Sequence, residues 1–385
     1  MSNLIEQITA AFTDDQHRRG IKVLRRSELP QCYEDISPEW LTDVLCNAHD
    51  GAEVRACELS PPDNGSSNRR KIRVEYNAAG TQAGLPTALF CKASHDLGNR
   101  IMLGVAGAAH AEVTFYNEIR PLLNIEAPQP YFARLDEHNY NSIILLKDLS
   151  TTGTEFCSHK TEMTRARAES QIRLLAELHG KGYQDPRIKQ QLARFISWPQ
   201  FFQNTCAFGM REGSEQGFLA AEAVIPPQLY RRAAEIWPAT VASVEHHNQL
   251  PHTLAHGDVH LKNWYVAAHG EMGLSDWQCT THAYWARDFA YTISTALRIE
   301  DRRVWERELL RLYLDRLHAA GGPAIGFDDA WTHYRQQLMS SLTWWTVTLT
   351  PAPGMPDMQP RDITLEFIRR IATAIDDVDA LSSFR

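Results

Sequence analysis

The sequence of 385 residues lacks the cysteine patterns that indicate disulfides or zinc. Its 7 cysteines are odd in number and widely scattered, and no CxxC pair occurs. A disulfide framework and a cysteine-based zinc site are therefore excluded. The chain also lacks an apolar run of about 18 residues, and its start lacks the basic and apolar segments of a signal peptide. We therefore expect a soluble, cytoplasmic protein without membrane insertion.

An excess of positive charge is also missing. Lys and Arg total 39 against 47 Asp and Glu, so the formal net charge is −8. A chain of this charge has no global field for nucleic acid, so nucleic acid is not an expected partner. No repeat of 20 to 50 residues occurs, and an apolar content of 43% with 22% charged residues is typical of a globular protein.

The first part of the chain is predicted to be rich in strands. Strand-like runs cover residues 53–59, 71–76, 87–93 and 143–146, and a polar loop separates the first two. A short helix is expected after Ser37, which precedes a proline in the N-cap position. A second helix is expected over residues 108–123. We therefore predict a small β-rich part with leading helices over residues 1–147.

The second part is predicted to be mainly helical. Linker chemistry over residues 148–160 precedes it, and a single strand-like stretch, 254–278, interrupts its helices. The expected helices cover residues 163–180, 226–247, 289–298, 304–320, 328–346 and 363–381. The predicted class is α+β, with a small β-rich N-lobe and a larger helical C-lobe over residues 161–385.

The strongest functional signal is His256-Gly257-Asp258-Val259-His260-Leu261-Lys262-Asn263, followed by Asp276. Phosphoryl transfer needs a carboxylate for the acceptor hydroxyl and oxygen ligands for Mg²⁺. The offset between Asp258 and Asn263 equals that of the protein-kinase catalytic loop. A hairpin over residues 264–275 would return Asp276 to the side of Asn263. Asp258 is therefore a candidate base, and Asn263 and Asp276 are candidate metal ligands.

Two upstream residues supply a candidate phosphate grip. Lys92 is a charged residue within an apolar strand. Glu112 shares one face of its predicted helix with apolar residues, namely Phe115, Tyr116, Ile119 and Leu123. A buried carboxylate needs a cation nearby, so we expect Glu112 to pair with Lys92. Kinases use such a pair to position nucleotide phosphates.

Other readings of these residues stay open at this point. His256, Asp258 and His260 could bind a metal as the centre of a hydrolase. The segment could also be a polar hairpin without function, or the chain a nucleotide-binding pseudokinase that serves as an interaction module. Neither the hydrolase nor the hairpin explains Asn263 and Asp276 together with the upstream pair.

The HGDxHxxN segment, Asp276 and Asp288-Phe289-Ala290 resemble the aminoglycoside phosphotransferase and choline kinase superfamily, above all its ecdysteroid kinase-like branch. The resemblance implies a two-lobed protein-kinase-like fold. It also implies that Asp288 belongs to the catalytic machinery by bracing the loop. Asp288 could also cap the helix that follows it, and the two roles can coexist. His179 is expected to be a core histidine.

The sequence departs from the superfamily pattern at two places. The phosphate loop has Gly65 without a glycine-rich motif, so the turn itself and the hydroxyls of Ser66 and Ser67 would have to hold phosphate. The hinge segment that contains Leu146, which is expected to bind adenine through its backbone, carries Lys147 where an acidic residue is usual.

Together these residues predict a small-molecule kinase. ATP and Mg²⁺ are the expected cofactors, and the expected acceptor is the hydroxyl of a small molecule. The branch resemblance favours a neutral or amphipathic alcohol, and no acidic run in the helical part suits a polycation.

Overall fold

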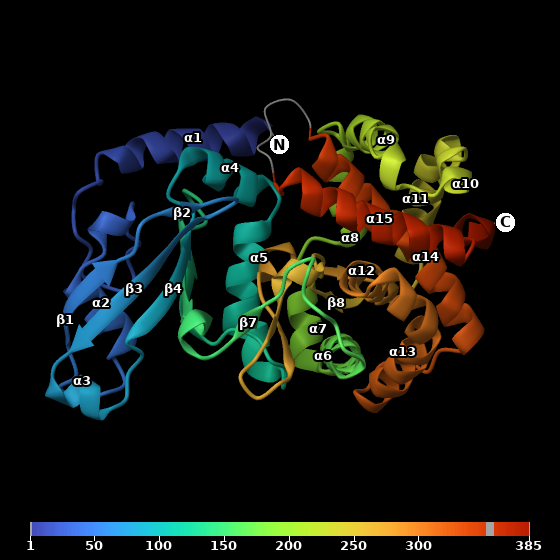
Figure 1. The fold of residues 1–385 in the computed structure, drawn as a ribbon. Coiled ribbons are helices and arrows are strands. Elements are labelled where there is room, and N and C mark those ends of the chain that lie inside the picture. Colours follow the sequence, from blue (N-terminus) through green and yellow to red (C-terminus); the bar gives the residue numbers. More distant parts are fainter. Residues whose placement is uncertain (1, 352–357, 385) are drawn as a thin grey trace. The chain divides into compact units, whose positions relative to one another are not determined.

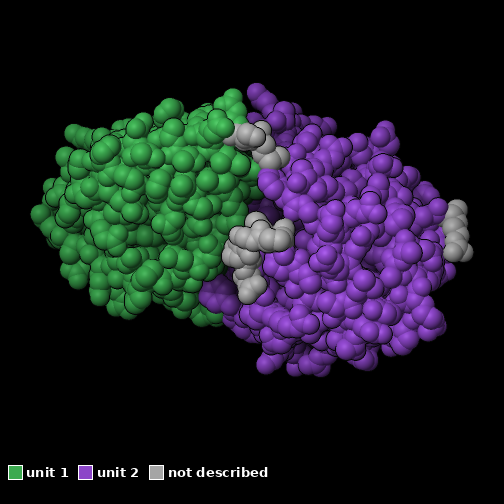
Figure 2. Space-filling view, turned by 90° about the horizontal axis from the view of Figure 1, so that it is seen from above, with its two compact units in different colours: residues 1–121, 128–154 green, residues 122–127, 155–385 purple. Residues whose placement is uncertain are grey.

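A computed structural model describes residues 2–351 and 358–384 (Figure 1). These residues form two compact units, shown in different colours in Figure 2. Unit 1 comprises residues 1–121 and 128–154, and unit 2 comprises residues 122–127 and 155–385. The chain therefore passes between the units three times. The hinge expected over residues 148–160 stays a prediction, and the membership of residues 122–127 in unit 2 was not foreseen.

Unit 1 contains one antiparallel sheet with the order β1-β3-β4-β6-β5, and β2 pairs with β3 (Figure 1). The predicted strands are present. β5 was missed because its sequence alternates poorly, and the short strand β2 lies in the predicted polar loop. The strands are β1 (Val54–Leu59), β2 (Asp63–Asn64), β3 (Asn68–Tyr76), β4 (Ala88–Ala93), β5 (Pro130–Leu135) and β6 (Ser142–Lys147).

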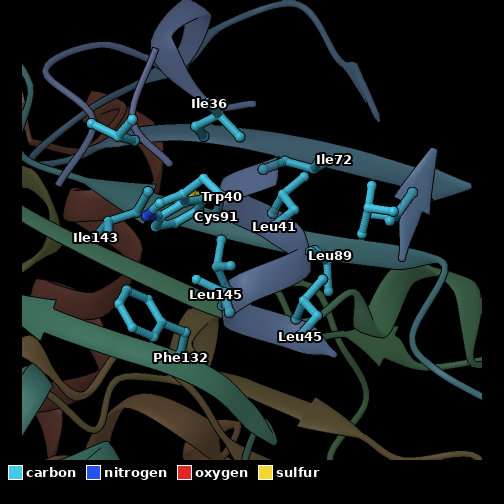
Figure 3. Close-up of a cluster of buried hydrophobic side chains, with 14 of the residues drawn as sticks. Ile36, Trp40, Leu41, Leu45, Ile72, Leu89, Cys91, Phe132, Ile143 and Leu145 are labelled. Atoms are coloured by element: carbon cyan, nitrogen blue, oxygen red, sulfur yellow. The ribbon is translucent and has the colours of Figure 1, made fainter. Parts of the chain in front are cut away.

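The core of unit 1 lies between the sheet and helix α2 (Pro38–Leu45) (Figure 3). The Ser37 side chain accepts a hydrogen bond from the Trp40 amide and so caps this helix, as expected. Fully buried Trp40 packs edge-on against Phe132 of β5, with ring centroids 5.6 Å apart. Leu89 and Cys91 of β4 belong to this core. Because side chains alternate along a strand, Lys92 points to the opposite face.

Unit 1 has more helix than expected. The additional helices include α3 (Ala78–Gln82) and α4 (Leu97–Val105), and the unit also contains α1 (Ser2–Gln16) and α5 (Ala108–Thr114). A buried ion pair ties α4 to α1, because Arg100 lies 2.6 Å from Asp15 and has no exposed side-chain surface. The helix predicted over residues 108–123 begins as α5, continues as a π-helix over Phe115–Ile119 and ends in a 3₁₀ turn at Arg120–Leu122.

Unit 2 is mainly helical, as expected, and its strands between residues 253 and 283 correspond to the predicted strand-like stretch. Three short helices between residues 186 and 220 were missed, because each is too short to show a clear periodicity. The helix predicted over residues 226–247 is broken at Arg231–Arg232. The helices are α6 (Arg165–Gln184), α7 (Pro186–Leu192), α8 (Trp198–Cys206), α9 (Met210–Ala220), α10 (Pro227–Tyr230), α11 (Ala233–Asn248), α12 (Ala286–Ala296), α13 (Ile299–Ala319), α14 (Phe327–Leu349) and α15 (Arg361–Asp377).

Short strands frame the motif segment of unit 2. The predicted hairpin is confirmed: β9 (Trp264–Val266) pairs with β10 (Met272–Leu274), and β7 (Glu155–Phe156) extends this sheet. β8 (Thr253–Ala255) pairs with β11 (Thr281–Ala283). Residues 256–263 therefore run from β8 to β9. None of the helices in the described ranges is long and apolar enough to cross a membrane.

Candidate active site

The ion pair predicted in unit 1 is present. Lys92 Nζ of β4 lies 2.8 Å from Glu112 Oε1 of α5. The two side chains are only 8% and 6% exposed. The apolar residues predicted on the Glu112 face are buried as well, although the helix changes to π geometry after Thr114. The Glu112 carboxylate therefore holds the Lys92 ammonium in one place, and a grip on phosphate by Lys92 stays a prediction.

The polar loop of unit 1 is the turn between β2 and β3. The Gly65 amide donates to the Ser67 carbonyl at 3.0 Å, and Ser66 is half-buried whereas Ser67 is only 4% exposed. The sequence prediction missed Asn68, whose amide group holds this turn. Its Nδ2 donates to Asn64 and Asp96, and its Oδ1 accepts from the His95 amide.

Leu146 lies in β6, between β4 and β5, and its side chain is buried. The predicted roles of Ser66 and Ser67 toward phosphate, and of Leu146 toward adenine, stay predictions.

Asp258 occupies the loop between β8 and β9 of unit 2, and its side chain keeps 18% of its surface exposed. Oδ1 accepts a hydrogen bond from the Tyr291 hydroxyl at 3.1 Å, and Oδ2 accepts one from Asn263 Nδ2 at 3.2 Å. His260 Nε2 lies 3.5 Å from Oδ2. Burial raises the pKa of the Asp258 carboxyl, whereas His260 and the hydrogen bond from the Tyr291 hydroxyl lower it. The lowering effects are the larger, so the pKa of Asp258 lies below its ordinary value. Asp258 is therefore an ionised carboxylate at neutral pH.

The predicted hairpin brings Ser275, the residue before Asp276, against Asn263. The amide and the hydroxyl of Ser275, which precedes Asp276, both donate to the Asn263 carbonyl at 2.9 Å. Asn263 uses its side-chain nitrogen toward Asp258, so its amide oxygen is the atom suited to a cation. Asp276 has a left-handed backbone with a φ of 63°. An amide oxygen and a carboxylate are hard donors that fit Mg²⁺.

Asp288 braces the loop, as the resemblance implied. Its Oδ2 accepts from the His256 amide at 2.7 Å and its Oδ1 from the Gly257 amide at 3.1 Å. The alternative role as an N-cap is wrong, because α12 begins at Ala286 and its N-cap is Trp285. Asp288 has no exposed surface, so it positions the loop and does not touch a substrate.

His179 supports Asp288 from α6. Its Nε2 lies 3.4 Å from Asp288 Oδ2, and its Nδ1 bonds to the Tyr313 hydroxyl at 2.7 Å. The prediction of a satisfied core histidine is confirmed.

The geometry of His256 argues against a metal-dependent hydrolase. Its Nδ1 accepts the Asp258 amide at 3.2 Å, and its Nε2 lies 3.0 Å from the Ser275 carbonyl, to which it can only donate. One neutral tautomer satisfies both bonds and leaves no lone pair for a metal. Burial lowers the pKa of His256, which favours this neutral form. Within the described ranges, no three His, Cys, Asp or Glu residues are grouped so that they could hold a metal ion.

The structure thus brings the predicted residues together within each unit. Lys92 and Glu112 meet in unit 1, and Asp258, Asn263, Asp276 and Asp288 converge on one loop in unit 2. The sequence prediction missed Tyr291, although its place three residues after Asp288 on a helix was a usable signal. It also missed Arg287, whose Nη1 donates to the Gly257 carbonyl at 2.6 Å.

Solved structures similar to this chain include two choline kinases and an aminoglycoside phosphotransferase. A choline kinase from Cryptosporidium parvum has a TM-score of 0.53 and 12% identity over 84% of this chain and 90% of that chain. A choline kinase from Streptococcus pneumoniae has a TM-score of 0.47 and 12% identity, covering 86% and 94%. An aminoglycoside phosphotransferase from Streptomyces rimosus has a TM-score of 0.43 and 17% identity, covering 75% and 93%. The likeness to the first shows a two-lobed, kinase-like α+β fold.

The family follows from the sequence match. The ecdysteroid kinase-like family model matches residues 61–321, about two thirds of the chain. The chain belongs to this family, which is the branch that its motifs resemble. No curated protein matches it.

Proposed function

We propose that the chain transfers the γ-phosphoryl group of ATP to a hydroxyl of a small molecule. Asp258 orients the hydroxyl and takes up its proton. Asn263 and Asp276 hold Mg²⁺, which neutralises charge on the phosphates when bound. Lys92, held by Glu112, grips the phosphates, with Ser66, Ser67 and the backbone near Leu146 completing the nucleotide site.

The observation that carries the proposal is the state of Asp258. Its carboxylate is ionised, partly exposed and held at both oxygens, by Tyr291 and by Asn263. A base must reach its substrate in the deprotonated form and in a fixed orientation. The brace from Asp288 to two successive loop amides fixes the backbone that carries Asp258.

The nucleotide half of the proposal rests on Lys92 and on the family. A lysine that is 8% exposed would be costly to bury without its partner, and Glu112 supplies the opposite charge. Solved structures with similar folds are described as complexes with AMP, ADP or GDP. We propose ATP as the donor and Mg²⁺ as the metal.

The acceptor is proposed to be a neutral or amphipathic alcohol. The acidic pair Asp376-Asp377 of unit 2 is already bonded and so offers little to a polycationic acceptor, because Asp377 pairs with Arg302 and Arg303 and Asp376 accepts from Gln228. The family match favours a steroid-like alcohol, since the description of the family names ecdysteroids.

The proposal is tested by ADP release from Mg·ATP in the presence of hydroxylated compounds, with steroid-like and lipid-like alcohols, choline, ethanolamine and an aminoglycoside as the panel. Asp258→Asn should lower transfer by about 10²–10⁴-fold while Mg·ATP affinity and folding persist. Asp328→Asn, which changes an exposed aspartate of α14, is the matched control and should be silent.

Two rivals give different results. A pseudokinase would bind Mg·ATP and transfer nothing to any acceptor. A metal-dependent hydrolase would retain zinc through purification and would act without nucleotide. Undiminished transfer by a folded Asp258→Asn variant would remove Asp258 from the mechanism.

A further inference from the structure

One face of α12 contacts four successive residues of the loop that carries Asp258. Asp288 binds the amides of His256 and Gly257. Tyr291, three positions later, donates to Asp258 Oδ1 at 3.1 Å. Thr292 Oγ1 lies 3.5 Å from the Val259 carbonyl. Positions three and four apart share a helix face, so a single rigid element sets both the loop backbone and the carboxylate.

We propose that Tyr291 is a positioning residue for phosphoryl transfer, holding the Asp258 carboxylate in one orientation through its hydroxyl. This inference rests on the proposed function, since it concerns the base of that reaction. Tyr291 does not touch the acceptor in this proposal, and it acts only through Asp258.

The surroundings of Tyr291 fix its hydroxyl as the donor. The residue is 1% exposed, and burial together with the charge of Asp258 raises its pKa well above the ordinary value. The phenol therefore stays protonated and donates its hydrogen to the carboxylate. The ring cannot swing away easily, because it packs against His260, with centroids 6.3 Å apart, inside a filled core.

Two donors on opposite oxygens prevent rotation of the carboxylate. Asn263 Nδ2 binds Oδ2 from the loop itself, and the Tyr291 hydroxyl binds Oδ1 from α12. Without the hydroxyl, Oδ1 loses this donor and the group can turn about its Cβ–Cγ bond. Misplacement of a reacting group by about 1 Å costs up to about 10²-fold in rate. We expect a loss of about tenfold or more in kcat.

The test is Tyr291→Phe, which removes one oxygen and keeps the ring. The readout is ADP formation from Mg·ATP with water as the acceptor and with any alcohol that stimulates the wild type. We expect kcat to fall by about tenfold or more while KM for Mg·ATP stays within about twofold. If Tyr291 had a purely structural role, Tyr291→Phe would change folding or Mg·ATP binding and would not lower kcat at an unchanged KM.

Tyr334→Phe is the matched control. The Tyr334 hydroxyl of α14 donates to Glu306 of α13 at 2.8 Å, and Tyr334 is fully buried. The same chemical change at that position should leave kcat at the wild-type value. In an Asp258→Asn background, Tyr291→Phe should add no further loss, because residues that act as a unit are not additive.

Three results would overturn the inference: a wild-type kcat in folded Tyr291→Phe, an equal fall in Tyr334→Phe, or a further loss in the Asp258→Asn background. A wild-type chain that forms no ADP refutes the proposed function instead. In that case a crystal structure of Tyr291→Phe still decides the positioning: a turned Asp258 carboxylate supports it, and an unchanged one overturns it.

Discussion

The buried pair of Lys92 and Glu112 offers the sharpest test of the physical argument. In Glu112→Gln the Lys92 ammonium loses the carboxylate 2.8 Å away while only 8% of the lysine side chain faces solvent. Removing one partner of a buried pair costs up to about 3–5 kcal/mol, because the remaining charge loses the attraction that offset its desolvation. Both side chains keep slight exposure, so we expect Glu112→Gln to lower the free energy of unfolding of unit 1 by about 3 kcal/mol, the lower end of this range.

The assay must report unit 1 alone, since two units need not unfold together. Trp40 is the one tryptophan in residues 1–154, and it is fully buried in the core of unit 1 (Figure 3). The ¹⁹F resonance of 5-fluorotryptophan at this position, assigned with Trp40→Phe, therefore follows the unfolding of this unit in urea.

The double variant Lys92→Met/Glu112→Gln removes both charges and should cost less than the sum of the single variants. We expect a coupling energy of about 2 kcal/mol. Lys71→Met is the control: Lys71 is 3.6 Å from Asp148 but 49% exposed, so its loss should cost less than about 1 kcal/mol. If the loss of stability in the double variant equals the sum of the two single losses within about 0.5 kcal/mol, the two residues do not stabilise unit 1 as a pair.

Two further predictions concern unit 2. Asp276→Asn keeps a side chain that tolerates the left-handed backbone, so it should weaken Mg·ATP binding by about tenfold or more without affecting metal-free ATP; equal calorimetric affinities would remove Asp276 as a ligand. Burial lowers the pKa of His247 to about 3 from an ordinary 6.5, so the unfolded chain binds more protons between these values. The free energy of unfolding should therefore decrease as the pH is lowered below 6.5, by up to about 1.4 kcal/mol per pH unit. Urea unfolding at pH 7 and at pH 5 measures this decrease, which should be smaller in His247→Gln than in the wild type.

The chemistry of the site was largely predictable, because its groups lie in short, specific segments. Asp258 and Asn263 share one loop, and a hairpin of two short strands is enough to return Asp276 to them. Lys92 was predictable for a different reason: an isolated charge in a buried strand must find a partner.

What the sequence could not supply was long-range packing. Arg100 of α4 meets Asp15 of α1 across 85 positions, and nothing local to either residue indicates the other. The tie between Asp288 and the amides of His256 and Gly257 likewise depends on how α12 approaches β8. The preference of aspartate for N-cap positions suggested that Asp288 caps a helix, but in the structure its carboxylate binds the loop amides instead.

Residues 122–127 are synthesised long before the residues of unit 2 to which they bind. Both neighbouring stretches of chain belong to unit 1, yet the Glu126 carbonyl accepts the Leu274 amide at 3.1 Å and its carboxylate accepts the Tyr265 hydroxyl at 2.8 Å. The ribosome reaches Leu274 roughly 7–30 s after Glu126, at about 5–20 residues per second. During that interval Glu126 cannot form its hydrogen bonds with Tyr265 and Leu274, although the segments of unit 1 on both sides of it in the sequence are being completed. A fragment that stops at Thr154 would carry the same defect permanently.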